Sequence, residues 1–113
     1  MSAPAPDPGV SVLRLRGAAD ALRLRTAVVG GPRRHEPLIV DLSDASSLDP
    51  ATAALLVDAV ARCEEAGRPC VLLVPRTCPE RVRGLFERRG LTRLLPIASS
   101  WDEALRRAGR SAA

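Results

Sequence analysis

Three hydroxyl side chains lie close to an expected helix start, in the stretch LSDASSLDPATAALLVDA at residues 42–59. Ser46 and Ser47 precede that start, and Thr52 lies in the first turn. Backbone N–H groups at a helix N-terminus can hold a phosphate, because they lack intrahelical acceptors and the helix dipole favours negative charge there. Phosphorylation of one of these hydroxyls is therefore the first chemistry to consider.

The other reactive side chains predict neither catalysis nor metal binding. Cys63, Cys70 and Cys78 are separated by seven and eight positions, and His35 is the only histidine. That spacing fits neither zinc ligands nor a redox motif, and it predicts buried thiols in a cytoplasmic protein. The glycine-rich run at 28–34, VVGGPRR, lacks the G-K-[ST] ending of a phosphate loop. We expect no enzyme activity and no cofactor, whereas nucleotide binding without hydrolysis stays open.

A buried strand and an amphipathic helix must position the hydroxyls. Residues 37–42, PLIVDL, are mostly apolar and predict a central strand that delivers Asp41 and Ser43 to its C-terminal end. Asp49 as N-cap and Pro50 at the first helical position begin the helix. We expect it to end near Ala66 and Gly67, with an inner face formed by Ala53, Leu56, Val57, Val60 and Cys63 or Glu64.

The remaining patterns predict a single α/β domain at 10–109, between a disordered proline-rich leader at 1–9 and a tail at 110–113. The expected fold is a four-stranded, mixed or parallel sheet with four helices, because strands separated by helices require crossover connections. Further strands are expected at 10–17, 69–75 and 94–98, and further helices at 20–29, 79–90 and 100–109, the last begun by Ser99 or Ser100.

The charge distribution favours a protein partner. All 17 basic residues are arginine and the net charge is +4, but residues 41–75 carry two arginines against six acidic side chains. Aromatic residues make up only 2%, so no stacking platform accompanies the arginines and we expect no nucleic-acid partner. No apolar run approaches the ~20 residues of a membrane span, so we expect no membrane insertion.

Three landmarks make the chain resemble the STAS domain family, named for sulfate transporters and anti-sigma factor antagonists. The segment LIVDLSDASSLDPATAALL is similar to the family's strand, D-L-S and helix-opening D-S-S-G or D-S-T-G. GAAD at 17–20 is similar to G-E-L-D, and RRGLTRLLPIASSWDEAL is similar to the family's ending. The resemblance spans roughly residues 10–108. It implies a STAS-like fold and a non-enzymatic, protein-binding function.

The resemblance to the bacterial regulators of this family implies that the chain binds an anti-sigma factor that is also a serine kinase. Phosphorylation of the second hydroxyl residue of D-S-S-G breaks that complex. Here Pro50 and Ala51 occupy the two hydroxyl positions and Thr52 occupies the glycine position. Since alanine has no oxygen to phosphorylate, the usual switch is predicted to be absent. Thr52 is displaced by about 100° around the helix and is interpreted as helping to cap it, and a shifted phosphoacceptor is the alternative role.

We therefore expect a cytoplasmic protein-interaction module that binds an anti-sigma factor or kinase-like ATPase in transcription regulation. The alternative is a STAS-like accessory subunit of an ABC-type or other membrane transporter, docked on an ATPase. The oligomeric state stays open. Asp44, Asp49 and Asp58 are expected to face outward toward arginines of the partner. The expected partner-binding residues are Asp20, Ser43, Asp44, Ser46, Ser47, Asp49, Ala51 and Thr52.

Overall fold

The computed structural model describes residues 10–17, 36–48, 50–88, 90, 93 and 95–109. The expected leader at 1–9, the expected helix at 20–29 and the tail at 110–113 lie outside these residues.

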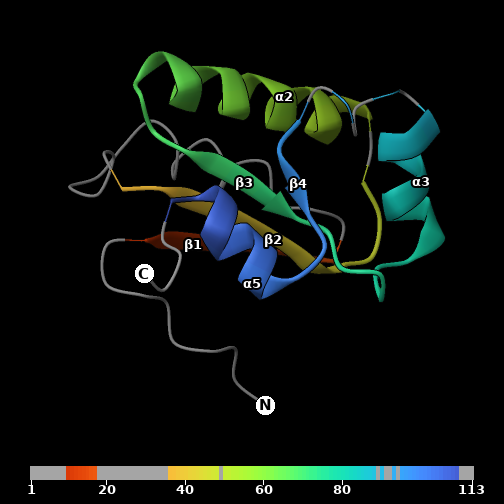
Figure 1. The fold of residues 1–113 in the computed structure, drawn as a ribbon. Coiled ribbons are helices and arrows are strands. Elements are labelled where there is room, and N and C mark those ends of the chain that lie inside the picture. Colours follow the sequence, from red (N-terminus) through yellow and green to blue (C-terminus); the bar gives the residue numbers. More distant parts are fainter. Residues whose placement is uncertain are drawn as a thin grey trace.

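Four parallel strands form one sheet in the order β1-β2-β3-β4 (Figure 1). They are β1 (Ser11–Gly17), β2 (Leu38–Ala45), β3 (Cys70–Leu73) and β4 (Ile97–Ala98). The sheet is therefore parallel in all its described pairs rather than mixed. The register between β1 and β2 shifts between Arg14 and Arg16, which is an irregularity at the C-terminal half of the edge strand.

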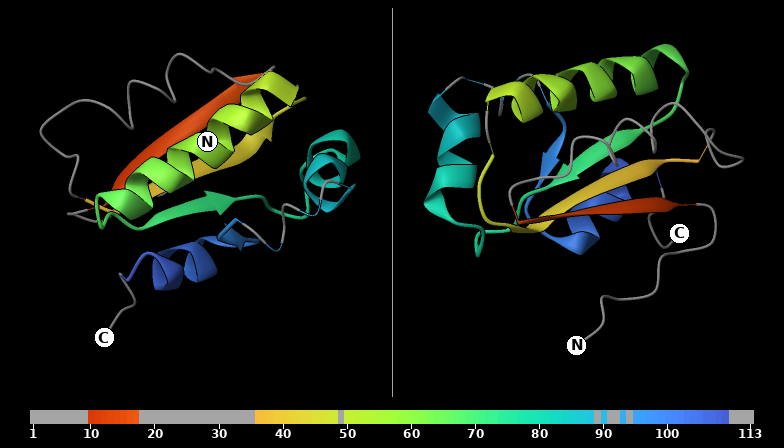
Figure 2. Two further views of the ribbon diagram at one scale, coloured as in Figure 1. Left: turned by 90° about the horizontal axis from the view of Figure 1, so that it is seen from above. Right: turned by 180° about the vertical axis from the view of Figure 1, so that it is seen from behind.

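Three helices are described: α2 (Pro50–Glu65), α3 (Glu80–Arg88) and α5 (Trp101–Arg107). Because the strands follow one another in sheet order and crossovers are right-handed, the connecting helices α2 and α3 cover the same face. The last described helix, α5, packs on the opposite face. The two further views in Figure 2 show α2 and α5 on opposite sides of the sheet.

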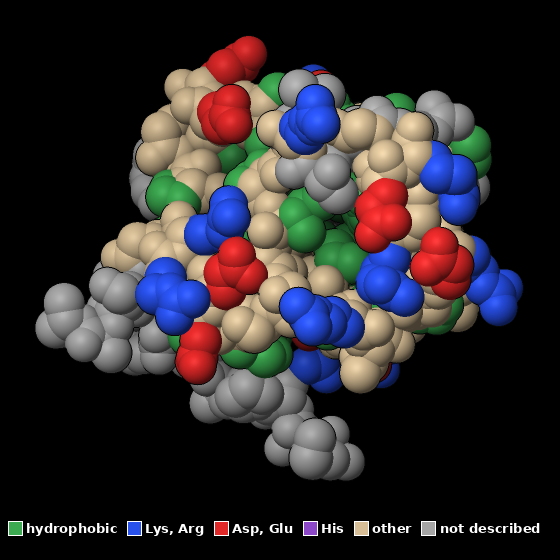
Figure 3. Space-filling view, turned by 45° about the vertical axis from the view of Figure 1, so that its right-hand side comes forward, with side chains coloured by type: hydrophobic (Ala, Val, Ile, Leu, Met, Phe, Trp, Pro, Cys, Tyr) green, Lys and Arg blue, Asp and Glu red, His purple; other side chains and the backbone are tan. Residues whose placement is uncertain are grey.

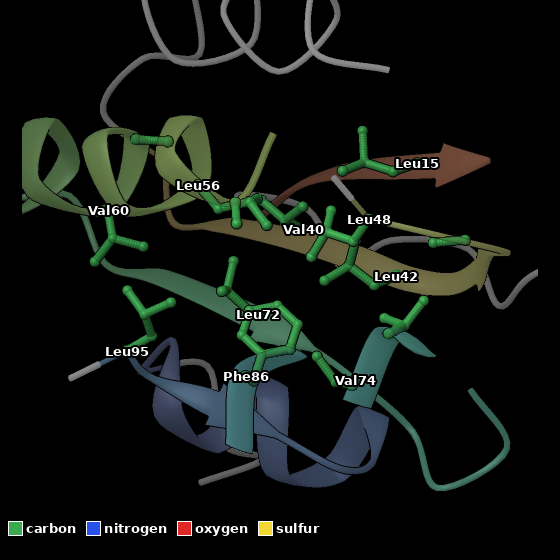
Figure 4. Close-up of a cluster of buried hydrophobic side chains, with 14 of the residues drawn as sticks. Leu15, Val40, Leu42, Leu48, Leu56, Val60, Leu72, Val74, Phe86 and Leu95 are labelled. Carbon is green, nitrogen blue, oxygen red and sulfur yellow. The ribbon is translucent and has the colours of Figure 1, made fainter. Parts of the chain in front are cut away.

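The larger hydrophobic core lies between the sheet and the helices α2 and α3. Alternate residues of the parallel strands point into it, and apolar residues spaced three or four apart point down from the helices. Figure 4 shows these side chains meeting from both layers. Its labelled members are Leu15, Val40, Leu42, Leu48, Leu56, Val60, Leu72, Val74, Phe86 and Leu95.

The smaller core lies under α5 on the other face of the sheet, where Ile39 and Val71 are buried and Trp101 is half-buried. Ser100 caps this helix by accepting a hydrogen bond from the Glu103 N–H, which agrees with the expected start at Ser99 or Ser100. Trp101 packs against this core.

Two details differ from the expected pattern. The strand β2 continues to Ala45, so Ser43 and Asp44 belong to the sheet rather than to the following loop. The prediction that Val57 lies on the inner face of α2 is wrong, because its side chain is 40% exposed. At about 100° per residue, Val57 falls one step outside the buried arc that contains Ala53, Leu56 and Val60.

Candidate protein-docking site

The candidate site is built where β2 ends and α2 begins. In a parallel sheet the C-terminal strand ends lie at one edge, and the loops that follow them present side chains there. Residues 46–48 connect the two elements, with Ser46 exposed, Ser47 half-buried and Leu48 buried in the main core. Leu48 therefore fixes this short loop to the body of the domain, while the serines point outward around it.

Asp41 organises the polar part of this edge. Its side chain is fully buried, and its Oδ1 accepts hydrogen bonds from the Ser43 N–H at 2.9 Å and the Ser43 hydroxyl at 2.6 Å. The Arg14 Nε of the neighbouring strand donates to Oδ2 at 3.1 Å. A buried carboxylate requires such partners, because an unpaired charge in the interior is costly. Asp41 thus has a structural role that joins β1 to β2 and orients Ser43.

Asp44 lies on the exposed side of the same group. The side chain is 51% exposed, and its Oδ2 is 3.7 Å from the Arg14 Nε. Since exposed ion pairs contribute little to stability, this contact leaves Asp44 available to a partner at little cost. Ser43, by contrast, is half-buried, and its hydroxyl donates to Asp41.

The first turn of α2 separates an exposed position from a buried one. Pro50 and Ala51 are exposed, whereas Thr52 is only 4% exposed and Ala53 is also buried. The step of about 100° from position 51 to position 52 carries the side chain from solvent into the protein. The residue with a hydroxyl therefore faces the interior, and the residue that faces solvent has none.

The solvent side of α2 forms a narrow, mostly apolar strip. Positions four or three apart lie on one helix face, so the exposed residues form a continuous row. Val57 is the one exposed large hydrophobic side chain among the described residues. We call this row the outer α2 face; it consists of Pro50, Ala51, Ala54, Val57, Asp58 and Ala61.

Acidic side chains flank the outer α2 face. Asp58 accepts a hydrogen bond from the Arg62 Nε at 2.8 Å, and this contact raises the pKa of the Arg62 guanidinium. Glu64 and Glu65 are exposed beyond it. Asp58, Glu64 and Glu65 thus give three carboxylates against Arg62 on and beyond this face.

The structure brings six of the eight expected site residues to one edge of the domain. Ser43, Asp44, Ser46 and Ser47 come from β2 and its loop, and Ala51 and Thr52 come from α2. The remaining two, Asp20 and Asp49, lie outside the described residues. Whether any of the eight contacts a partner stays a prediction.

Sequence reasoning missed two residues of this edge. The first is Arg14, which strand alternation and a register opposite Asp41 could have indicated. Val57 was assigned to the core, although its angle on the helical wheel lies between those of Pro50 and Glu64, two polar-side positions.

The described residues were also searched for a metal site, a membrane-spanning helix and a strongly charged surface. Within them, no three side chains of histidine, cysteine, aspartate or glutamate are grouped so as to hold a metal ion. No described helix is long and apolar enough to cross a membrane. On the side of the molecule that carries α3, arginines and acidic side chains are interspersed rather than gathered into one charged stripe (Figure 3).

Comparisons with known proteins agree with this architecture. A family model described as "Mlab, STAS domain" matches residues 3–96. A sulfate transporter family protein from Wolinella succinogenes superposes with a TM-score of 0.70 at 21% identity, over 89% of this chain and 85% of that one. The STAS domain of a SulP transporter from Vibrio cholerae gives 0.64 at 18% identity, over 89% and 80%. No curated protein matches the chain. Since the family model covers most of its length, the chain belongs to the Mlab-type STAS domain family.

Proposed function

We propose that this chain is a non-enzymatic accessory subunit of a membrane transporter and that it docks on the transporter's cytoplasmic ATPase. The family match supports a STAS interaction module, and both structural neighbours are transporter proteins by their descriptions. Transcription regulation, the leading expectation from the sequence, has no comparable support among these comparisons. The transporter alternative is therefore the better supported of the two.

The observation that carries the proposal is the exposed outer α2 face. Single exposed hydrophobic residues are ordinary, but Val57 here continues a row of small side chains that lets another backbone approach closely. Such a flat, apolar centre with charges around it has the composition of a modest protein interface. We infer that a helix of the ATPase lies against it.

The charges at this edge define the partner further. Asp58 lies on the outer α2 face and Glu64 and Glu65 are exposed beyond it, whereas Arg62 is the one arginine of α2. Complementary charges steer association and fix orientation more than they add affinity. The docking surface of the ATPase should therefore carry arginine or lysine residues.

Docking in this proposal is constitutive rather than switched by a kinase. At the exposed position of the first turn stands Ala51, which has no phosphorylatable atom, and the neighbouring Thr52 is buried. A phosphate on the first turn of α2 would place a bulky, doubly charged group where the partner docks, but that turn offers no exposed acceptor. The subunit should thus remain bound throughout the transport cycle.

An anti-sigma factor with kinase activity is the second candidate partner, because the STAS resemblance places its contact on the same helix start. The composition of the outer α2 face fits a transporter ATPase and an anti-sigma factor equally well. Identification of the protein that binds this chain distinguishes the two.

The test is capture of the tagged full-length chain from detergent-solubilised membranes of its native cell. We expect it to retain an ATPase together with its permease, and we expect the intact mass of the captured chain to include no phosphate. Ala54→Arg should abolish this retention, because a long charged side chain replaces a methyl group at the centre of the outer α2 face.

Ala66→Arg is the matched control. It introduces the same side chain at an exposed position near the other end of α2, about 18 Å away along the helix, and should leave retention unchanged. Recovery of an anti-sigma factor instead of transporter subunits would refute the proposal, as would equal loss of binding in both variants.

A further inference from the structure

The helix α3 has a charged side that points away from the core. Val82, Leu85 and Phe86 are buried beneath the helix. The helix lies at one end of the molecule (Figure 1), so its other side is open to a neighbouring protein. We call this side the outer α3 face; its exposed charged residues are Glu80, Arg81, Glu87 and Arg88.

Gly84 lies in the middle of the outer α3 face. Glycine is a poor helix former, so its place inside a helix needs a reason. The atoms nearest to the position that a Cβ would take are the side-chain ends of Arg88 and Glu80, at 2.6 and 2.9 Å. These side chains are flexible, so packing within the domain does not demand a glycine here. The missing side chain instead lets the backbone of another helix come close.

Acidic and basic side chains lie on opposite sides of Gly84. At about 100° per residue, Glu80 and Glu87 lie roughly 40–60° to one side of the glycine. Arg81 and Arg88 lie roughly 40–60° to its other side. The outer α3 face therefore carries an acidic row and a basic row with the glycine between them, and Figure 3 shows both signs of charge on this side of the molecule.

This arrangement of charge is complementary to itself when two copies of α3 lie parallel. A two-fold axis along the helices places the acidic row of each copy beside the basic row of the other. Glu80 then lies opposite the partner's Arg81, and Glu87 lies opposite the partner's Arg88, and the symmetry produces each pair twice. An antiparallel pairing brings the two acidic rows together, and like charges across an interface oppose association.

We propose that the chain forms a parallel, two-fold symmetric dimer through the outer α3 face, with Gly84 of the two copies at its centre. A helix of nine residues offers a small contact, so the dimer is weak and reversible. The outer α2 face belongs to another helix and stays free, so each dimer presents two docking surfaces. The dimer does not depend on which protein docks there, so its test is independent of the proposed function.

Sedimentation equilibrium of the purified full-length chain measures this association. Over a range of about 10 μM to 1 mM protein, which brackets a weak dimer, we expect the average mass to rise from 12.0 kDa toward twice that value. Because salt screens exposed ion pairs, the dimer should weaken about tenfold between roughly 20 and 500 mM sodium chloride. An average mass of 12.0 kDa at every protein concentration in low salt would overturn the proposal.

Charge reversal tests which side chains pair. Arg81→Glu combined with Arg88→Glu makes both rows acidic, and Glu80→Arg combined with Glu87→Arg makes both rows basic. Each double variant alone should remain monomeric, whereas an equimolar mixture should form a dimer with one copy of each. All four positions are exposed, and circular dichroism of each variant checks that it is folded.

Glu64→Arg combined with Glu65→Arg is the matched control. It changes the net charge by the same amount as the basic α3 variant, at exposed positions on α2, and should leave the dimer unchanged. A dimer formed by either α3 variant alone, or an equal loss of the dimer in the α2 variant, would contradict the assigned contact. Because association is read first in the wild-type chain, the proposal stays testable even if a variant fails to fold.

Discussion

At the residue scale, Asp41 and its partners Arg14 and Ser43 connect the strands β1 and β2 near their C-terminal ends. A buried carboxylate with three hydrogen-bond donors around it is stabilising only while all of its partners remain. Arg14 is partly exposed, at 24% of its side chain, so solvent screens part of its interaction. The larger contribution comes from the bonds that the buried oxygens accept.

Asp41→Asn should therefore lower the free energy of unfolding by about 2 kcal/mol, since it removes the buried charge that faces Arg14 and puts an amide donor next to existing donors. Urea denaturation measures this change. Asp44→Asn is the control, because loss of this exposed carboxylate should lower the free energy of unfolding by less than about 0.5 kcal/mol. Equal losses in the two variants would contradict the structural role given to Asp41.

Thr52 and Ala51 show how a step of one residue along a helix decides whether a hydroxyl is accessible to a kinase. The two residues are adjacent in the chain, but one is buried and the other exposed. A kinase needs an acceptor that it can surround, so exposure matters more here than the presence of a hydroxyl nearby.

At the element scale, α2 has different functions at its two ends. Its N-terminal turns present the outer α2 face, and its C-terminal turn ends in a Schellman motif at Gly67.

Two glycine variants test how backbone conformation at and within the helices affects stability. Gly67→Ala should lower the free energy of unfolding by about 1 kcal/mol, because a left-handed φ of 70° strains any side chain even though no atom lies within 4 Å of the new Cβ. Gly84→Ala lies inside α3, where alanine favours the helix by about 1 kcal/mol.

At position 84, the new Cβ would meet only the mobile ends of Arg88 and Glu80, at 2.6 and 2.9 Å. These can move aside, so Gly84→Ala should leave stability equal or slightly higher. Thermal unfolding of both variants measures the contrast. If both changes acted in the same direction, backbone conformation would not be the cause.

At the scale of the whole molecule, the shifted pKa values of Cys63 and Cys70 make stability depend on pH. The pKa of Cys63 is lowered from 9.0 to about 7 in the folded protein, so folding favours its thiolate. A lowered folded-state pKa gives stability that is present above the unfolded value and is lost as the pH falls through the folded value.

Stability should therefore rise as the pH increases from about 7 to 9. Above that window the raised pKa of Cys70 acts in the opposite direction, because the unfolded chain releases a proton that the folded chain keeps. Chemical denaturation at a series of pH values measures this contribution in the reduced protein.

Cys63→Ala should flatten the slope between these pH values, and Cys78→Ala should not. An unchanged slope in Cys63→Ala would show that another group titrates in this range.

The sequence by itself determined the α/β class, the order of strands and helices, and the start of α2. These features depend on local apolar spacing, on turn-forming glycine and proline, and on the crossover that parallel strands require. The STAS family was also identifiable from Asp41, Ser43 and the matching ending of the chain.

Only the tertiary structure decided which side chains meet. The Arg14–Asp41 pair depends on strand register, and the exposure of Val57 depends on where the sheet lies under the helix. Each is a contact between separate elements. Local spacing fixes the direction of a side chain relative to its own helix or strand, but it leaves open what the neighbouring element places opposite.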